Sequence, residues 1–231
     1  MYVTRIQRIM RLLTICALSL GIAGGAQAAT VDFESFATNT SINSVVFTDG
    51  TTASVTTNSN RSVGNGGTNQ AVVFDTDNPT GNDNDLAAPF PSASGGEAST
   101  PGNILIIAGP QNGNLTLPDD DAAGGTIVFE FDRLVTFLGF DYFDTEAGSN
   151  RLIFSTDTGF NSGNLVAGNG QYDTFSTSIF GVKSVTFDLG GSGGIDNLKI
   201  AAPVPVPAAL PLMLAGLGGL GFMARRKRKA G

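Results

Sequence analysis

The sequence predicts an all-β domain, a two-sheet sandwich of jelly-roll type, between an N-terminal signal peptide and a C-terminal transmembrane helix. Two observations predict the sandwich. Within 29–202, turn-forming Gly, Ser, Thr, Asn and Asp interrupt the chain every few residues, and no segment of this domain has convincing helical spacing of its apolar residues. Apolar residues alternate with polar ones instead, most clearly in 126–132, where Ile127, Phe129 and Phe131 share one face. Many short strands of this kind are typical of sandwiches.

The candidate strands, in chain order, are the runs 29–33, 44–47, 52–56, 70–74, 103–107, 125–131, 135–143, 151–155, 172–176, 182–189 and 195–200. Most of the 16 phenylalanines fall within them, so we expect phenylalanine to fill the core. Two long loops, 75–102 and 109–123, interrupt the pattern. Loops of this length in compact β domains are usually either functional or mobile.

The N-terminal segment has the three parts of a secretory signal peptide. Arg5, Arg8 and Arg11 precede an apolar run, 12–22, and a small-residue site at 26–28 follows. We expect signal peptidase to cut between Ala28 and Ala29, which removes residues 1–28 and with them the single cysteine, Cys16. A lipidation site at Cys16 is disfavoured because Ile15 is too large for the preceding position. The mature chain then has no thiol and no disulfide.

The C-terminal segment, 203–231, also has three parts. A proline motif comes first, Val204, Pro205, Val206, Pro207 and Ala208, followed by an uncharged apolar run, 208–224, and a basic cluster, 225–229. As a helix the run would rise about 25 Å, enough to cross a thin bilayer, with the basic end in the cytoplasm.

This order of motif, helix and basic end resembles the PEP-CTERM sorting signals of bacteria, in particular the variant with a Val-Pro-Leu-Pro-Ala motif, from which Val206 departs conservatively. The resemblance implies recognition by an exosortase, a membrane transpeptidase-like protease, and delivery to the cell surface. It also implies an association with exopolysaccharide production. The alternative is an ordinary C-terminal membrane anchor. Either way we expect an exported protein held in the inner membrane, transiently or permanently, by the helix.

The composition of the domain between these segments, 29–202, excludes several functions. All 20 acidic residues of the chain lie there with five basic residues, a formal net charge of −15. Such a surface does not favour nucleic acid or anionic lipid. The chain has no histidine, which excludes Ser-His-Asp and Cys-His catalytic sites and histidine-ligated zinc. We therefore expect no enzymatic activity.

A calcium site is one interpretation of the acidic loop, where Asp75, Asp77, Asp83 and Asp85 alternate with asparagines. Calcium takes carboxylate and amide oxygens of this kind, although the spacing is not that of an EF-hand. The alternative is a solvated loop built on Asx turns. For the run of three aspartates at 119–121, a solvated turn is the preferred interpretation, because adjacent carboxylates point in different directions.

Further candidates lie near strand ends. Asp141 is expected on the face opposite Tyr142. Two of the three carboxylates of Asp141, Asp144 and Glu146 could in principle serve as the pair of a glycosidase, although loop-end carboxylates or calcium ligands are favoured. Asp196 lies in a Gly-Ile-Asp-Asn-Leu turn, 194–198, similar to the ends of exported jelly-roll domains. It could cap that turn or ligate a structural cation. Tyr172 and Asp141 are the candidate ligand-binding residues, and a half-buried strand tyrosine is the alternative for Tyr172.

These observations lead to one expected function and two alternatives. We expect an exported, non-catalytic protein of the cell surface or extracellular matrix with a structural or adhesive role linked to exopolysaccharide. The first alternative is a carbohydrate-binding module, with calcium as a possible stabilising cofactor. The second is a polysaccharide-active enzyme, which the lack of histidine and the few basic residues disfavour.

Overall fold

The computed structural model describes residues 27–61, 69–80, 84–109 and 117–202. Asp83 and most of the signal peptide lie outside the described residues, as does the whole segment 203–231, with the predicted transmembrane helix 208–224. Within the described ranges no helix is long and apolar enough to cross a membrane.

The described chain is all-β, which confirms the predicted class. In chain order its strands are β1 Ala28–Val31, β2 Ser41–Ile42, β3 Ser44–Val46, β4 Thr52–Ser59, β5 Ala71–Asp75, β6 Asn103–Ile107, β7 Gly125–Phe143, β8 Leu152–Thr156, β9 Asn161–Leu165, β10 Tyr172–Leu189 and β11 Gly194–Ala201. One 3₁₀ turn, η2 at Gly148–Asn150, precedes β8. Short β2 and the polar β9 have no counterpart among the predicted strands, because neither has the alternation of a half-buried strand.

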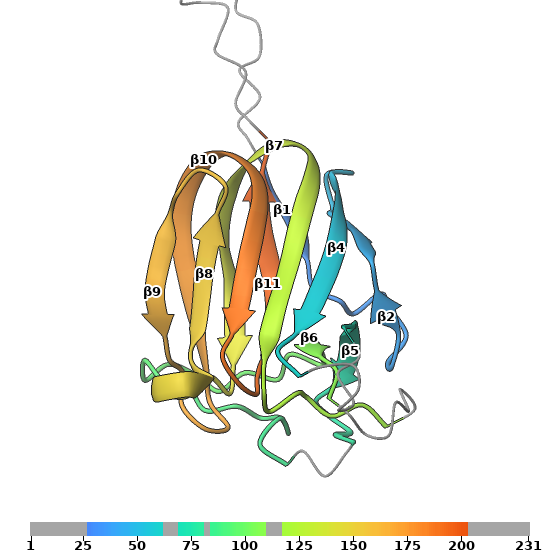
Figure 1. The fold of residues 1–231 in the computed structure, drawn as a ribbon, viewed down its shortest axis with the longest axis vertical. Helices are drawn as coiled ribbons and strands as arrows, with labels where there is room; N and C mark the ends of the chain where they lie inside the picture. Colours follow the sequence, from blue (N-terminus) through green and yellow to red (C-terminus); the bar gives the residue numbers. More distant parts are fainter. Residues whose placement is uncertain (1–26, 62–68, 81–83, 110–116, 203–231) are drawn as a thin grey trace, which may run out of the picture. The chain divides into compact units, whose positions relative to one another are not determined.

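Two long strands, β7 and β10, each replace a pair of predicted strands. They run antiparallel and pair along their length, from Tyr172 opposite Phe143 to Leu189 opposite Gly125. Register shifts between Ser176 and Ser184 interrupt the ladder midway, where both strands pass from one layer to the other (Figure 1). Irregularities of this kind let a paired ribbon bend without breaking. The two layers therefore belong to one hydrogen-bonded sheet of 11 strands, rather than to two separate sheets.

The strand order is that of a jelly roll. In one layer β6, β11, the second half of β7 and the first half of β10 are neighbours. In the other layer the order is the first half of β7, the second half of β10, β8 and β9. The pairs β8–β9, β7–β10 and β6–β11 are thus nested, as in a long hairpin rolled into two layers. β5 and β2 extend the first layer, and β4 and β3 extend the second.

Phenylalanine fills the space between the layers, as the sequence predicts. Phe140 of the first layer lies 4.8 Å from Phe187 and 5.2 Å from Phe154, both of the second layer, measured between ring centroids. Phe137 stacks on Phe154 at 4.8 Å. All four rings are fully buried. Each such pair adds about 0.5–1.5 kcal/mol beyond the burial of its area, so these contacts hold the two layers together.

A second, smaller core lies on the outer face of the first layer. It contains Ile104 and Ile106 of β6, Phe74 of β5 and Phe143 of β7, and it is covered by two residues of the 76–102 loop, Leu86 and Phe90. Both are completely buried. This long loop is thus anchored to the sheet, and the anchor fixes the position of Asp85, next to Leu86.

Candidate functional site

An acidic group lies where several loops meet at one end of the sandwich. Asp144 directly follows β7, with a backbone φ of 55°. Its side chain is buried, and its two carboxylate oxygens accept hydrogen bonds from the Gly170 backbone N–H at 2.6 Å and the Ser192 hydroxyl at 3.1 Å. Asp144 therefore connects the end of β7 to the loops before β10 and β11.

Asp120 brings the loop before β7 to the same place, and its carboxylate accepts a hydrogen bond from the Gly193 backbone N–H. Burial raises the pKa of Asp120 to about 8, and the charges of Asp144, Asp119 and Asp85 add to the effect. Burial likewise raises the pKa of Asp144 to about 6, again with a contribution from Asp85. We call Asp85, Asp120 and Asp144 the loop-end cluster.

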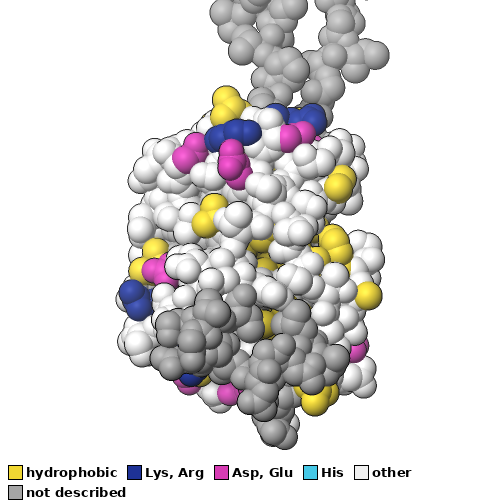
Figure 2. Space-filling view, turned by 45° about the vertical axis from the view of Figure 1, so that its right-hand side comes forward, with side chains coloured by type: hydrophobic (Ala, Val, Ile, Leu, Met, Phe, Trp, Pro, Cys, Tyr) yellow, Lys and Arg dark blue, Asp and Glu magenta, His cyan; other side chains and the backbone are white. Residues whose placement is uncertain are grey.

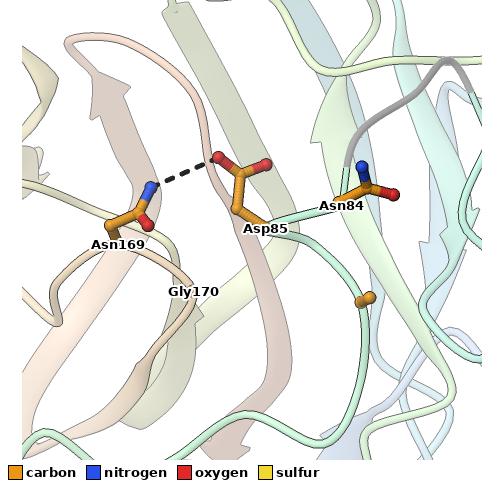
Figure 3. Close-up of a pocket in the computed structure, with 5 residues that line it drawn as sticks. Asn84, Asp85, Asn169 and Gly170 are labelled. Carbon is orange, nitrogen blue, oxygen red and sulfur yellow. Dashed lines mark hydrogen bonds between the residues drawn. The ribbon is translucent and has the colours of Figure 1, made fainter.

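A depression of about 510 Å³ borders this cluster, lined by Asn84, Asp85, Ala87, Asn169 and Gly170. The Asn169 side-chain amide donates to the Asp85 carboxylate at 3.3 Å, which joins the anchored loop to the loop before β10 (Figure 3). The depression presents amide and carboxylate groups, which can bind hydroxyl-rich ligands or cations. It offers no histidine or thiol.

The predicted calcium loop is divided between two environments. Asp75 ends β5, and its carboxylate accepts hydrogen bonds from the backbone N–H groups of Asp77 and Asn78 at 3.0 and 3.2 Å, and from the Asn78 side chain. This is the Asx-turn arrangement that the sequence left as the alternative. Asp85 lies in the depression, and Asp83 lies outside the described residues. Calcium binding by this loop stays a prediction.

The predicted solvated turn at 119–121 is wrong for Asp121, which is only 1% exposed. Its carboxylate forms an ion pair with Arg61 at 3.1 Å and accepts a hydrogen bond from the Ser59 hydroxyl at 2.6 Å. These partners at the end of β4 precede Asp121 by about 60 residues, so no local spacing in the sequence could reveal them.

The two candidate ligand-binding residues lie in different surroundings. The Tyr172 ring is partly buried and stacks on Phe143 of the smaller core at 5.9 Å, and its hydroxyl donates to the Glu97 carbonyl. Asp141 accepts hydrogen bonds from the Thr174 hydroxyl at 2.7 Å and the Asn197 side chain at 2.9 Å. As predicted, Asp141 lies on the face opposite Tyr142, which belongs to the main core. Neither residue lines the depression.

A second acidic group surrounds Asp196 near the start of β11. Asp196 lies opposite Asp141 in the β7–β11 ladder and is 1% exposed. Burial raises the pKa of Asp196 to about 9, and Asp141, Asp32 and Glu34 contribute through their negative charges. We call these four residues the strand-junction cluster. Among the described residues, no three Asp, Glu, His or Cys side chains are grouped so that they could hold a metal ion.

Comparison with known proteins informs the C-terminal segment rather than either cluster. No curated protein matches the chain. Residues 203–229 match the PEP-CTERM protein-sorting motif, which includes the proline motif, the apolar run and the basic end. The Val-Pro-Val-Pro-Ala form at 204–208 is compatible with the Val-Pro-Leu-Pro-Ala variant. The protein therefore carries a PEP-CTERM sorting signal, which marks it as an exported substrate of an exosortase.

Proposed function

We propose that the protein is a non-catalytic structural or adhesive component of the cell surface or extracellular matrix, associated with exopolysaccharide. The observation that carries the proposal is the sorting motif at 203–229, joined to a β-sandwich with its own core between Ala29 and Ile200. Such a chain delivers a stable domain to the outside of the cell.

The chemistry of the surface supports a role without catalysis. Figure 2 shows a face made mostly of uncharged polar side chains and backbone, with one group of acidic and basic side chains near its upper end and others scattered along the sides and the lower end. In the loop-end cluster, the hydrogen bonds to Asp144 and Asp120 come from loop backbone and from Ser192, which is a structural arrangement. Without histidine in the chain, the buried carboxylates have none of the usual basic partners of an acyl-transfer site.

Intact-mass analysis of the protein from its native host tests the sorting step. In surface and medium fractions we expect a chain that starts at Ala29 and ends near the 204–208 motif. Replacement of both Pro205 and Pro207 by alanine should leave an unprocessed chain in the membrane fraction. A wild-type chain that retains 225–229 and occurs only in the membrane would contradict sorting and leave a plain anchor.

The matrix role needs a separate test in a strain that cannot make exopolysaccharide. We expect the processed protein to move from the surface fraction to the medium, because its partner is absent, while its mass stays that of the wild-type product. An unchanged distribution between the fractions would contradict the association with exopolysaccharide without affecting the sorting step.

A carbohydrate-binding module is the second candidate, favoured by the polar depression next to Asp85. Amide and carboxylate groups at Asn84, Asp85 and Asn169 can bind sugar hydroxyls. A glycan array probed with the wild-type chain and Asn169→Ala tests it, with Asn164→Ala on exposed β9 as the matched control. Binding that is lost only in Asn169→Ala would favour the module over a purely structural role.

A further inference from the structure

The strand-junction cluster contains a buried carboxylate oxygen that has no hydrogen-bond partner. This atom is Oδ1 of Asp196. The residue is 1% exposed, so water does not replace the missing partner at the surface. A buried, unpaired polar atom is costly and rare in folded proteins, and a bound ion is one way in which such an atom gains a partner.

The backbone around Asp196 is open on one side. β11 pairs with β6 up to Ile195, opposite Leu105, and with β1 from Leu198, opposite Val31. Between these two ladders, Asp196 and Asn197 lie where the edge partner of β11 changes, and Asn197 has a φ of 50°. In this gap, Asp196 and Asn197 pair with neither β6 nor β1.

Two carboxylates of the segment after β1 lie near enough to this gap for their charges to act on Asp196. They belong to Asp32 and Glu34, one and three residues after the end of β1, and both are exposed. Glu34 accepts a hydrogen bond from the Asn103 backbone N–H at 2.6 Å, which holds its carboxylate at the start of β6. A Cβ atom at Gly102 would lie 2.7 Å from Glu34 Oε1, so the backbone there closely approaches the carboxylate.

Among the described residues, no basic side chain forms an ion pair with the cluster. The ion pairs within these ranges are Arg61–Asp121 and Arg133–Asp132, and neither involves the strand-junction carboxylates. A concentration of negative charge with one buried, unpaired oxygen is suited to a divalent cation.

We propose that the strand-junction cluster binds one calcium ion, with Asp196 Oδ1 as the buried ligand and Glu34 as the carboxylate ligand at the surface, while main-chain carbonyls, side-chain amides and water complete the coordination. Calcium takes about six to eight oxygens in a flexible geometry, and carbonyls, amides and water serve as well as carboxylates. The site therefore does not need three converging carboxylates, which the described residues do not provide. The ion links the first strand to the last.

Calorimetric titration of calcium chloride into the full chain, purified in detergent and freed of metal with EDTA, tests the proposal. We expect one saturable site with a Kd of about 0.1–1 mM, the range of extracellular calcium modules. Calcium at ten times its Kd should raise the Tm by about 3–6 °C. Asp196→Asn should remove both the binding and the Tm shift. A wild-type chain that takes up no calcium at about 10 mM would overturn the proposal.

The control is Asp85→Asn, which removes a carboxylate from the predicted calcium loop and should leave the affinity unchanged. If Asp85→Asn loses calcium and Asp196→Asn retains it, the ion binds the acidic loop and the proposal is wrong. Should Asp196→Asn fail to fold, Glu34→Gln, at an exposed position, provides the test. We expect at least tenfold weaker binding, and an unchanged affinity would overturn the proposal. The function proposed above does not depend on this result.

Discussion

The loop-end and strand-junction clusters both bring acidic side chains together, but they differ in how the carboxylates are satisfied. In the loop-end cluster, Asp144 uses both oxygens to accept hydrogen bonds, and Asp120 accepts one from Gly193. In the strand-junction cluster, Asp141 is similarly satisfied, but Asp196 Oδ1 has no partner. Burial raises the pKa of an aspartate in both.

This difference separates two uses of a buried carboxylate. Where a loop N–H and a loop hydroxyl donate to the two oxygens, as at Asp144, the carboxylate cross-links loops and its burial is partly compensated. Where an oxygen remains unpaired, as at Asp196, the fold lacks a positive partner at that point. The first arrangement is satisfied within the protein, and the second is the one for which we propose a calcium ligand.

The largest expected effect concerns the pH dependence of stability at Asp120, measured in EDTA. Its folded pKa of about 8 lies above its ordinary value of 3.8. The carboxyl group therefore favours folding at pH 4, and this contribution is lost as the pH rises to 8. The side chain of Asp120→Asn does not ionise. The free energy of unfolding of this variant minus that of the wild type should therefore rise by up to about 1.4 kcal/mol for each pH unit between pH 4 and 8. Urea unfolding at pH 4, 6 and 8 measures the difference.

The same series contains its own control at Asp144. The pKa of Asp144 is about 6, so the difference in free energy of unfolding between Asp144→Asn and the wild type should stop rising near pH 6. For Asp120→Asn the same difference should continue to rise toward pH 8. If the free energies of unfolding of the two variants change with pH in the same way, the pKa values of Asp120 and Asp144 do not differ as the structure indicates.

A smaller effect is expected from removing the hydrogen-bond acceptor in the loop-end cluster. Asp144→Ala leaves the Gly170 N–H without its 2.6 Å partner and places alanine at a φ of 55°. We expect a loss of about 2 kcal/mol in urea unfolding at pH 5. Asp144→Asn keeps an acceptor and tolerates this φ, so it should lose less than half as much. Equal losses would mean that the hydrogen bond to Gly170 contributes little.

The sequence predicts most of the fold because strand signals are local. The alternation of Ile127, Phe129 and Phe131 identifies the first half of β7, and all three side chains are buried in the main core. The union of 125–131 and 135–143 into one strand is not predicted, since the intervening Asp132 and Arg133 resemble a turn. Their ladder continues through the bend because β10 bends with β7.

The sites are harder to predict because their members meet only through the fold. The sequence does identify Asp196 as a candidate, because it lies in the Gly-Ile-Asp-Asn-Leu turn, and a cation ligand is one of the two roles considered for it. Its neighbours Asp32 and Glu34 lie more than 160 residues away in sequence, so no spacing connects them to it. The loop-end cluster escapes prediction for the same reason, since Asp120 and Asp144 come from loops on opposite sides of β7.

Substitution of Gly102 tests whether Glu34 of the strand-junction cluster is held in place. Gly102→Ala places a Cβ 2.7 Å from Glu34 Oε1 at a φ of 72°, whereas Gly148→Ala has a φ of 85° with nothing within 4 Å. Both should lose about 1 kcal/mol for the left-handed backbone. Gly102→Ala should lose about 1 kcal/mol more, because Glu34 must move away from the Asn103 N–H. Equal losses in thermal unfolding would show that Glu34 is not held there.

The smallest effect tests whether the two clusters are electrostatically independent. The charge of Asp85 raises the pKa of both Asp120 and Asp144, but it is not among the charges that raise the pKa of Asp196. Asp85→Asn should therefore lower the first two pKa values and leave the third unchanged, as followed by carboxyl-carbon NMR in EDTA. Stability should change by less than about 0.5 kcal/mol, since Asp85 is exposed. A changed pKa of Asp196 in this variant would mean that the two clusters are electrostatically coupled. Calcium at the strand junction would then also change the pKa values of Asp120 and Asp144.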